Sequence, residues 1–293
     1  MRPSVCIYEV GPRDGLQNEK AIIPTKDKIA LIDNLSGAGF RKIEATSFVS
    51  PKWVPQLADA AEVMAGIRRE PGIDYSVLTP NLKGAELALA AGADEFAIFT
   101  SASEGFCQKN INCSIAESLA RFEPVMELAA KAGIPVRGYV SCMVVCPYDG
   151  PVEPDAVARV TQSLIDLGCH EVSLGDTIGA GTPQSVSRAL DAVLRDVPAD
   201  RLAGHFHDTN DNALGNVKAA LALGLRTFDS AVGGLGGCPY APGAKGNVST
   251  SALVAMLESE GFDTGIDQSV LARAEQHLGH VRRDEQKTKE VTV

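Results

Sequence analysis

The sequence predicts a (β/α)8 barrel of the TIM type, a single α/β domain with a short C-terminal extension. Eight short β-rich runs alternate with longer helical runs, and glycines close several helices just before the next strand. The 293 residues, 45% of them hydrophobic, are enough for one large core. A doubly wound open sheet is the alternative, since it has the same alternation of strands and helices.

The elements follow one another at regular spacing. The expected strands are 5–10, 42–46, 74–78, 95–99, 136–141, 171–175, 202–207 and 227–232. The expected helices include 25–38, 81–92, 114–133, 153–168, 182–196, 212–224 and 249–259. Thr182 and Pro183 suit the start of a helix. Helix ends are indicated by Gly92, Gly133, Gly168 and Gly224. We expect the barrel to span 4–280 and the charged segment 281–293 to be a loosely packed tail.

The composition argues against several classes of partner. A net charge of -10 and a pI near 5.0 disfavour nucleic acid and anionic membranes, and 5% aromatic residues disfavour base stacking. Seven cysteines without a CxxC pair indicate reduced thiols. The first strand starts too soon after Met1 to leave room for a targeting peptide, and no apolar run approaches bilayer length. We therefore expect a cytoplasmic protein with neither a nucleic-acid nor a membrane partner.

The sharpest local pattern is GHFHDTN (204–210), at the end of the seventh expected strand. Side chains two apart on a strand share a face, so His205 and His207 can reach one ion. One histidine packing in the core and the other capping a loop is the simpler alternative. In a chain with five histidines, an H-x-H at a barrel strand end favours metal binding.

Further ligands should come from other strand ends, because active sites of such barrels lie there. Asp14 follows the first strand within EVGPRDGLQNE (9–19), and Asn247 follows the eighth. A mixed nitrogen and oxygen set suits Mg²⁺ or Mn²⁺ better than structural zinc. Gly11 and Gly15 would let the backbone turn, so that Arg13 and Asp14 reach the same substrate.

The segment GGLGGCPYAPGAKGN (233–247) is a glycine-rich loop. It lacks GxGxxG and GK[ST], which weakens a phosphate-binding interpretation and leaves that of a mobile lid. At its centre, Cys238 lies between glycines and a proline, a poor setting for a core residue. A reactive role is favoured over a structural one, and a thiol of pKa ~8.5 can donate a proton at neutral pH.

Two carboxylates, Glu44 and Asp176, also fall at expected strand ends. Each could act as a base, hold an arginine or orient a substrate, or could simply cap a helix or form an ion pair. With Gln17, they are candidate substrate-binding residues. Lesser candidates of the same kind are Ser47, Arg137 and Ser173.

Five segments together resemble the 3-hydroxy-3-methylglutaryl-CoA lyase family. They are EVGPRDGLQNE, IEATSFVSPKWVPQ (43–56), SLGDTIGAGTP (173–183), HFHDT (205–209) and GGLGGCPYAPGAKGN. The resemblance covers roughly residues 4–260. The Arg-Asp turn and the H-x-H are shared with a wider superfamily of metal-dependent TIM-barrel lyases and Claisen-type synthases, whereas GLQNE and GGCPYAPGA point to the lyases.

The resemblance implies retro-Claisen cleavage of (S)-3-hydroxy-3-methylglutaryl-CoA to acetyl-CoA and acetoacetate, in leucine catabolism or ketone-body formation. It implies an acyl-CoA substrate and a homodimer. Arg13 would sit at the thioester oxygen, Cys238 would be the catalytic loop cysteine, and His205 or Asp14 would accept the hydroxyl proton. The implied ligands of Mg²⁺ or Mn²⁺ are Asp14, His205, His207 and Asn247.

Three alternatives stay open. A Claisen-type synthase could use the same barrel and metal, although such enzymes usually carry further C-terminal domains. A lyase for a longer 3-hydroxy-3-acylglutaryl-CoA is possible because the pocket size cannot be read from sequence. A metal-binding scaffold or sensor is disfavoured, since the chain keeps both an acid candidate and a ligand set.

Overall fold

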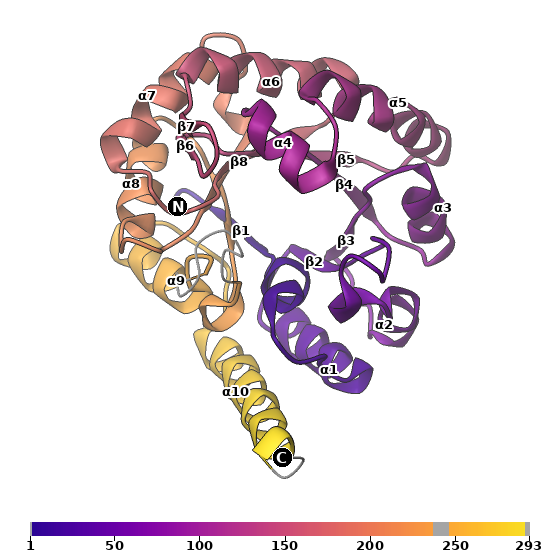
Figure 1. Cartoon of the computed structure of the whole chain (residues 1–293). Coiled ribbons are helices and arrows are strands. Elements are labelled where there is room, and N and C mark those ends of the chain that lie inside the picture. The colour runs from indigo at the N-terminus through magenta and orange to yellow at the C-terminus, as the bar shows by residue number, and fades with distance from the viewer. Residues whose placement is uncertain (1, 237–245, 291–293) are drawn as a thin grey trace.

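The computed structural model describes residues 2–236 and 246–290, with side chains up to residue 282. Eight parallel strands form a closed barrel in the order β1-β10-β9-β8-β5-β4-β3-β2, and helices surround it (Figure 1). The predicted (β/α)8 barrel is confirmed, and the open-sheet alternative is wrong. The barrel strands are β1 (Cys6–Glu9), β2 (Lys42–Ser47), β3 (Asp74–Leu78), β4 (Glu95–Ser101), β5 (Val136–Ser141), β8 (Glu171–Asp176), β9 (Leu202–Phe206) and β10 (Thr227–Ser230).

The helices match the expected ones closely. They are α1 (Thr25–Ser36), α2 (Ala60–Gly66), α3 (Leu82–Ala90), α4 (Glu104–Ile111), α5 (Ile115–Ala132), α6 (Pro154–Leu167), α7 (Pro183–Val193), α8 (Ala213–Ala222), α9 (Thr250–Ser259) and α10 (Gln268–Glu290). The predicted glycine stops all have positive φ. Thr182 caps α7 in a reciprocal capping box with Ser185.

The structure adds elements that the sequence did not predict. Helices α2 and α4 are short, and a hairpin of β6 (Val145–Cys146) and β7 (Gly150–Pro151) follows β5. In Figure 1, α4 lies across the face of the barrel. Helix α10 continues through the expected boundary at residue 281, so the charged segment is helical as far as Glu290.

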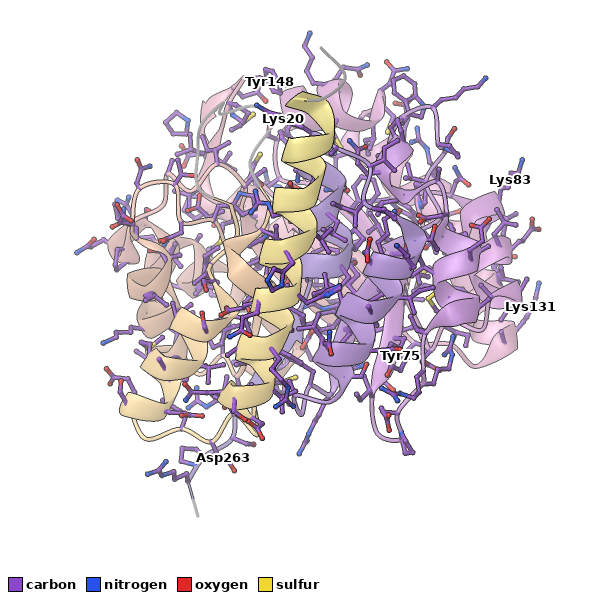
Figure 2. The ribbon with its side chains drawn as sticks, turned by 90° about the horizontal axis from the view of Figure 1, so that it is seen from below. Lys20, Tyr75, Lys83, Lys131, Tyr148 and Asp263 are labelled. Carbon is purple, nitrogen blue, oxygen red and sulfur yellow. The ribbon has the colours of Figure 1, made fainter. Side chains whose placement is uncertain are left out.

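The two ends of the barrel are easily distinguished in a side view. Figure 2 shows Lys20 and Tyr148, which follow β1 and β5, at one end, and Asp263 at the opposite end. The first end therefore holds the carboxyl termini of the strands, where barrel active sites lie. Among the residues that the structure describes, none of the helices is both long and apolar enough to span a bilayer.

Glu9, at the end of β1, fixes this end of the barrel from inside. Its Oε1 accepts hydrogen bonds from the amides of Gly11 and Val232, both at 2.8 Å, and its Oε2 accepts one from the Thr250 hydroxyl at 2.7 Å. The residue is fully buried. Burial outweighs these hydrogen bonds and raises the pKa of Glu9 from 4.5 to about 7.

The raised pKa of Glu9 predicts a pH-dependent stability. Its favourable contribution is fully present below pH 4.5 and is lost as the pH rises through about 7. Glutamine can keep the amide and hydroxyl partners without a charge. We expect the free energy of unfolding of Glu9→Gln, relative to the wild type, to rise by about 2 kcal/mol between pH 5 and pH 8. Urea titrations at both pH values test this, with the exposed Glu62→Gln as a control that should show no such change. A pH-independent difference for Glu9→Gln would contradict the prediction.

Candidate active site

Arg13 and Asp14 lie on a single tight turn after β1. The turn Gly11–Gly15 is π-helical, and the carbonyl of Val10 accepts the amides of Arg13 (3.2 Å), Asp14 (2.8 Å) and Gly15 (3.2 Å). Such turns are rare in proteins overall, and those that occur are often found at functional sites. Both charged side chains are thereby held at the end of the first strand.

The glycines of this turn are needed for space. Neither Gly11 nor Gly15 has a positive φ. A Cβ on Gly11 would lie 2.6 Å from Glu9 Oε1, and one on Gly15 would lie 2.6 Å from Leu235 Cβ. The expectation that they supply turning freedom is therefore wrong: they allow β1, its turn and the segment after β10 to pack closely.

Asp14, His205 and His207 converge as predicted. One ligand atom from each lies within 4.8 Å of the others. His205 Nε2 is 3.3 Å from His207 Nε2 and 4.0 Å from Asp14 Oδ2. Two imidazole nitrogens and a carboxylate oxygen facing one another form a possible site for a divalent metal ion.

Asn247 contacts this cluster through both its backbone and its side chain. It forms an isolated antiparallel bridge with His207, and its Nδ2 donates to Asp14 Oδ2 at 2.8 Å. Two buried polar atoms, Asn247 Oδ1 and His207 Nδ1, find no hydrogen-bond partner among the described residues. An unpaired buried acceptor is costly, so the side-chain oxygen of Asn247, close to the convergent ligands, fits the binding of a cation.

The electrostatics keep the cluster able to bind a cation. Burial alone would raise the pKa of Asp14, but Arg13 foremost and the two imidazoles lower it to about 2. Burial, with a smaller contribution from His205, lowers the pKa of His207 to about 4. At neutral pH, Asp14 is therefore an anion and His207 a neutral imidazole, the forms in which both can ligate a metal.

Arg13 is clamped by two carboxylates. Its Nη1 is 2.7 Å from Asp14 Oδ1, and its Nε is 2.5 Å from Glu44 Oε2. Glu44 is fully buried, and its Oε1 has no partner within the described part of the chain. Gln17 donates to Asp14 Oδ1 at 3.0 Å. The structure thus brings Gln17 and Glu44 to the cluster, where both contact the charged pair.

Asp176 is buried at the end of β8 and serves the following loop. Its carboxylate accepts the amides of Ala180 and Gly181 at 3.2 and 2.8 Å. Burial raises its pKa to about 6. These bonds account for the residue structurally, and its substrate-binding role stays a prediction. Cys238 lies outside the described residues.

Sequence reasoning missed two residues that contact the cluster. One is Asp229 in β10, whose Oδ2 lies 3.0 Å from His205 Nδ1. Tyr139, in β5, packs against the His205 ring at 6.2 Å between centroids and 83°, and the Arg13 guanidinium lies 5.6 Å from its ring. A charged residue in the middle of a buried strand was the available sign for Asp229.

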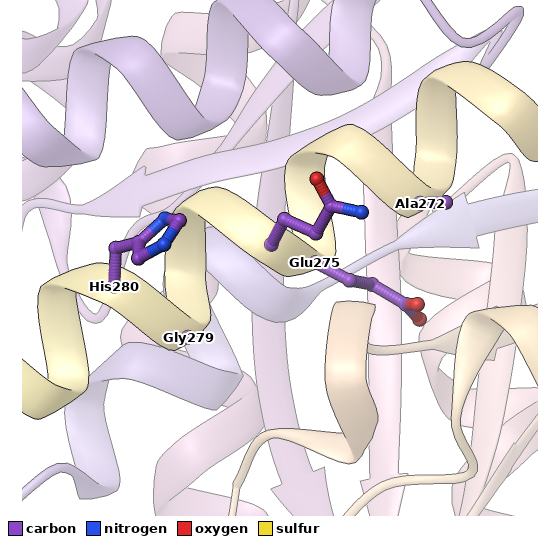
Figure 3. A pocket seen from close by; sticks show the side chains of 5 residues that line it. Ala272, Glu275, Gly279 and His280 are labelled. Carbon is purple, nitrogen blue, oxygen red and sulfur yellow. The ribbon is translucent and has the colours of Figure 1, made fainter.

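A separate hollow of about 550 Å³ lies along α10 on the outside of the barrel (Figure 3). Its lining residues are Ala272, Glu275, Gln276, Gly279 and His280. All five belong to one helix and none belongs to the convergent cluster. We therefore place the chemistry at the strand ends.

The fold and this cluster together define a class: a TIM-barrel enzyme with a possible divalent-metal site beside a buried arginine. A family model described as "HMGL-like" matches residues 4–278. The chain belongs to the HMGL-like family.

Several known proteins resemble the chain closely. It is 58% identical over 270 residues to the mitochondrial hydroxymethylglutaryl-CoA lyase of Bos taurus, covering 92% of this chain and 83% of that protein. A Pseudomonas aeruginosa relative, named 3-hydroxy-3-isohexenylglutaryl-CoA/hydroxymethylglutaryl-CoA lyase, is 56% identical and covers 94% and 91%. The crystal structure of the HMG-CoA lyase from Brucella melitensis has a TM-score of 0.95 and 62% identity, covering 96% and 99%.

Proposed function

We propose that this protein cleaves 3-hydroxy-3-methylglutaryl-CoA to acetyl-CoA and acetoacetate. The observation that carries the proposal is that Arg13 Nη1 lies 2.7 Å from Asp14, which itself converges with His205 and His207. A retro-Claisen cleavage needs two functions side by side. One activates a tertiary hydroxyl and the other stabilises a thioester enolate, and this cluster offers both.

Asp14, His205, His207 and Asn247 would hold Mg²⁺ or Mn²⁺. A divalent cation supplies Lewis-acid stabilisation of the substrate oxygen that loses its proton. Of the two candidate bases, Asp14 has a lowered pKa. Burial lowers the pKa of His205, but the hydrogen bond that its Nδ1 donates to Asp229 outweighs this and raises it. His205 can accept the hydroxyl proton only while its Nε2 is not bound to the ion; otherwise Asp14 is the base, directly or through a water.

Breaking the bond between C2 and C3 turns the hydroxyl carbon into the ketone of acetoacetate and leaves the enolate of acetyl-CoA. Arg13 would face the enolate oxygen. Glu44, Asp14 and the Tyr139 ring hold its guanidinium, so little reorganisation is needed as charge develops. The enolate carbon then takes a proton, which we assign to Cys238 from its place in the sequence motif.

The substrate class has independent support. An Acinetobacter baumannii protein, whose structure is described as an HMG-CoA lyase in complex with coenzyme A and 3-methylmalate, is 41% identical with a TM-score of 0.90. We expect this chain to bind coenzyme A thioesters as well and to act as a homodimer. Curated relatives are named mitochondrial in Bos taurus and cytoplasmic in Mus musculus. The cytoplasmic location stays a prediction.

A direct assay tests the proposal. The purified protein is incubated with (S)-3-hydroxy-3-methylglutaryl-CoA and Mg²⁺, and acetoacetate is measured with and without a chelator. Metal-dependent acetoacetate supports the lyase, and its absence overturns it. A parallel reaction with acetyl-CoA and a keto acid detects a synthase. The isohexenyl substrate of the Pseudomonas aeruginosa relative tests whether a longer acyl chain is accepted.

A further inference from the structure

The two histidines of the cluster differ in what holds them. His207 Nδ1 has no partner among the described residues. His205 Nδ1, by contrast, lies 3.0 Å from Oδ2 of Asp229, a buried carboxylate on the neighbouring strand β10. An imidazole whose Nδ1 faces an acceptor keeps its proton there and leaves the Nε2 lone pair free.

Other donors fix the Asp229 carboxylate. Arg137 donates a hydrogen bond to each of its oxygens, from Nη2 to Oδ1 at 2.7 Å and from Nη1 to Oδ2 at 3.1 Å. The Ser173 hydroxyl donates to Oδ2 at 2.8 Å. With His205, this gives the anion four donors, which fix the orientation of the carboxylate. Arg137, Ser173 and Asp229 are all at most 1% exposed.

Arg137 is itself immobilised deep in the barrel. Its Nε lies 2.7 Å from Glu171 Oε1, and its guanidinium stacks on the rings of Tyr8 at 4.1 Å and Tyr139 at 4.9 Å. Tyr139 also contacts the His205 ring edge-on. The barrel therefore sets both the protonated nitrogen of His205, through Asp229, and its ring plane, through Tyr139.

We propose that Asp229 is a positioning residue that holds His205 as the Nδ1-protonated tautomer, so that Nε2 faces Asp14 and His207 ready for a cation. Within the part of the chain that the structure describes, His207 Nδ1 has no such partner. This inference deepens the proposed function and rests on its metal site. Carboxylates that orient metal-binding histidines in this way typically contribute about 10- to 100-fold to metal affinity.

The first test needs no variant. In the metal-free wild type, ¹⁵N NMR of labelled histidines reports which nitrogen of each neutral imidazole carries the proton. We expect Nδ1–H for His205. An Nε2–H tautomer would overturn the proposal. This readout is independent of catalysis, so a protein without lyase activity would refute the proposed function and leave the tautomer result standing.

The second test is Asp229→Asn, whose amide cannot serve all four donors. We expect the Mn²⁺ dissociation constant, measured by calorimetry, to rise about 10- to 100-fold, with a change of tautomer at His205 and none at His207. Ser173→Ala, which removes one donor and keeps the carboxylate, should change it by no more than a few-fold. In a His205→Ala background, Asp229→Asn should have little further effect, because the two act as one unit. A folded Asp229→Asn with wild-type affinity, or additive effects in the double variant, would contradict the proposal.

Discussion

Arg13→Gln should lower kcat for cleavage of 3-hydroxy-3-methylglutaryl-CoA by about 10²- to 10³-fold, the effect of removing one preorganised donor from a developing oxyanion. KM should change much less, because the charge on the thioester oxygen appears only in the transition state. Steady-state kinetics at saturating Mg²⁺ measure both constants.

Two controls separate this electrostatic effect from structural damage. Removing the guanidinium leaves Glu44 and Asp14 without their common cation, so the unfolding free energy must be measured alongside. Arg13→Lys keeps the charge but loses the two-sided clamp, and its kcat should lie between those of the wild type and Arg13→Gln. A fall in kcat/KM that comes only from KM would place Arg13 in ground-state binding.

The fold was predictable because its determinants are local. Each barrel strand is a short apolar run, and the helices before several strands end at a glycine with positive φ. Helices α2 and α4 were missed because they are short, with seven and eight residues, and lack a long apolar repeat.

The candidate metal site was predictable in part. His205 and His207 share a strand end, and Asp14 follows a strand that is two places away in the barrel order. The partner of His205 was not predictable. Arg137 and Asp229 are 92 positions apart and meet across the barrel interior, so the pairing depends on strand tilt and register. Likewise, the close approach of Gly15 to Leu235 depends on how the two segments pack in the folded chain, so it could not be predicted from the sequence.

His207→Ala should lose mainly metal affinity, whereas Cys238→Ser should lose mainly turnover. His207 contributes one of the convergent ligand atoms, and its pKa of about 4 keeps it neutral at working pH. Its loss should weaken Mn²⁺ binding by at least about 10-fold, and excess Mn²⁺ should restore part of the activity.

Removal of the metal by a chelator should abolish turnover in the wild type, because the hydroxyl proton is then too weakly acidic to be removed.

Cys238→Ser is the matched variant. If Cys238 donates the proton to the enolate, serine should lower kcat by about 10²-fold or more, since a hydroxyl is a much weaker acid than a thiol. The Mn²⁺ dissociation constant should stay close to that of the wild type, and excess metal should restore nothing. Calorimetry with Mn²⁺ and initial rates over a range of metal concentrations distinguish the two variants. Equal losses of metal affinity in both would mean that Cys238 acts through the ligands, and its assignment as the acid would then be wrong.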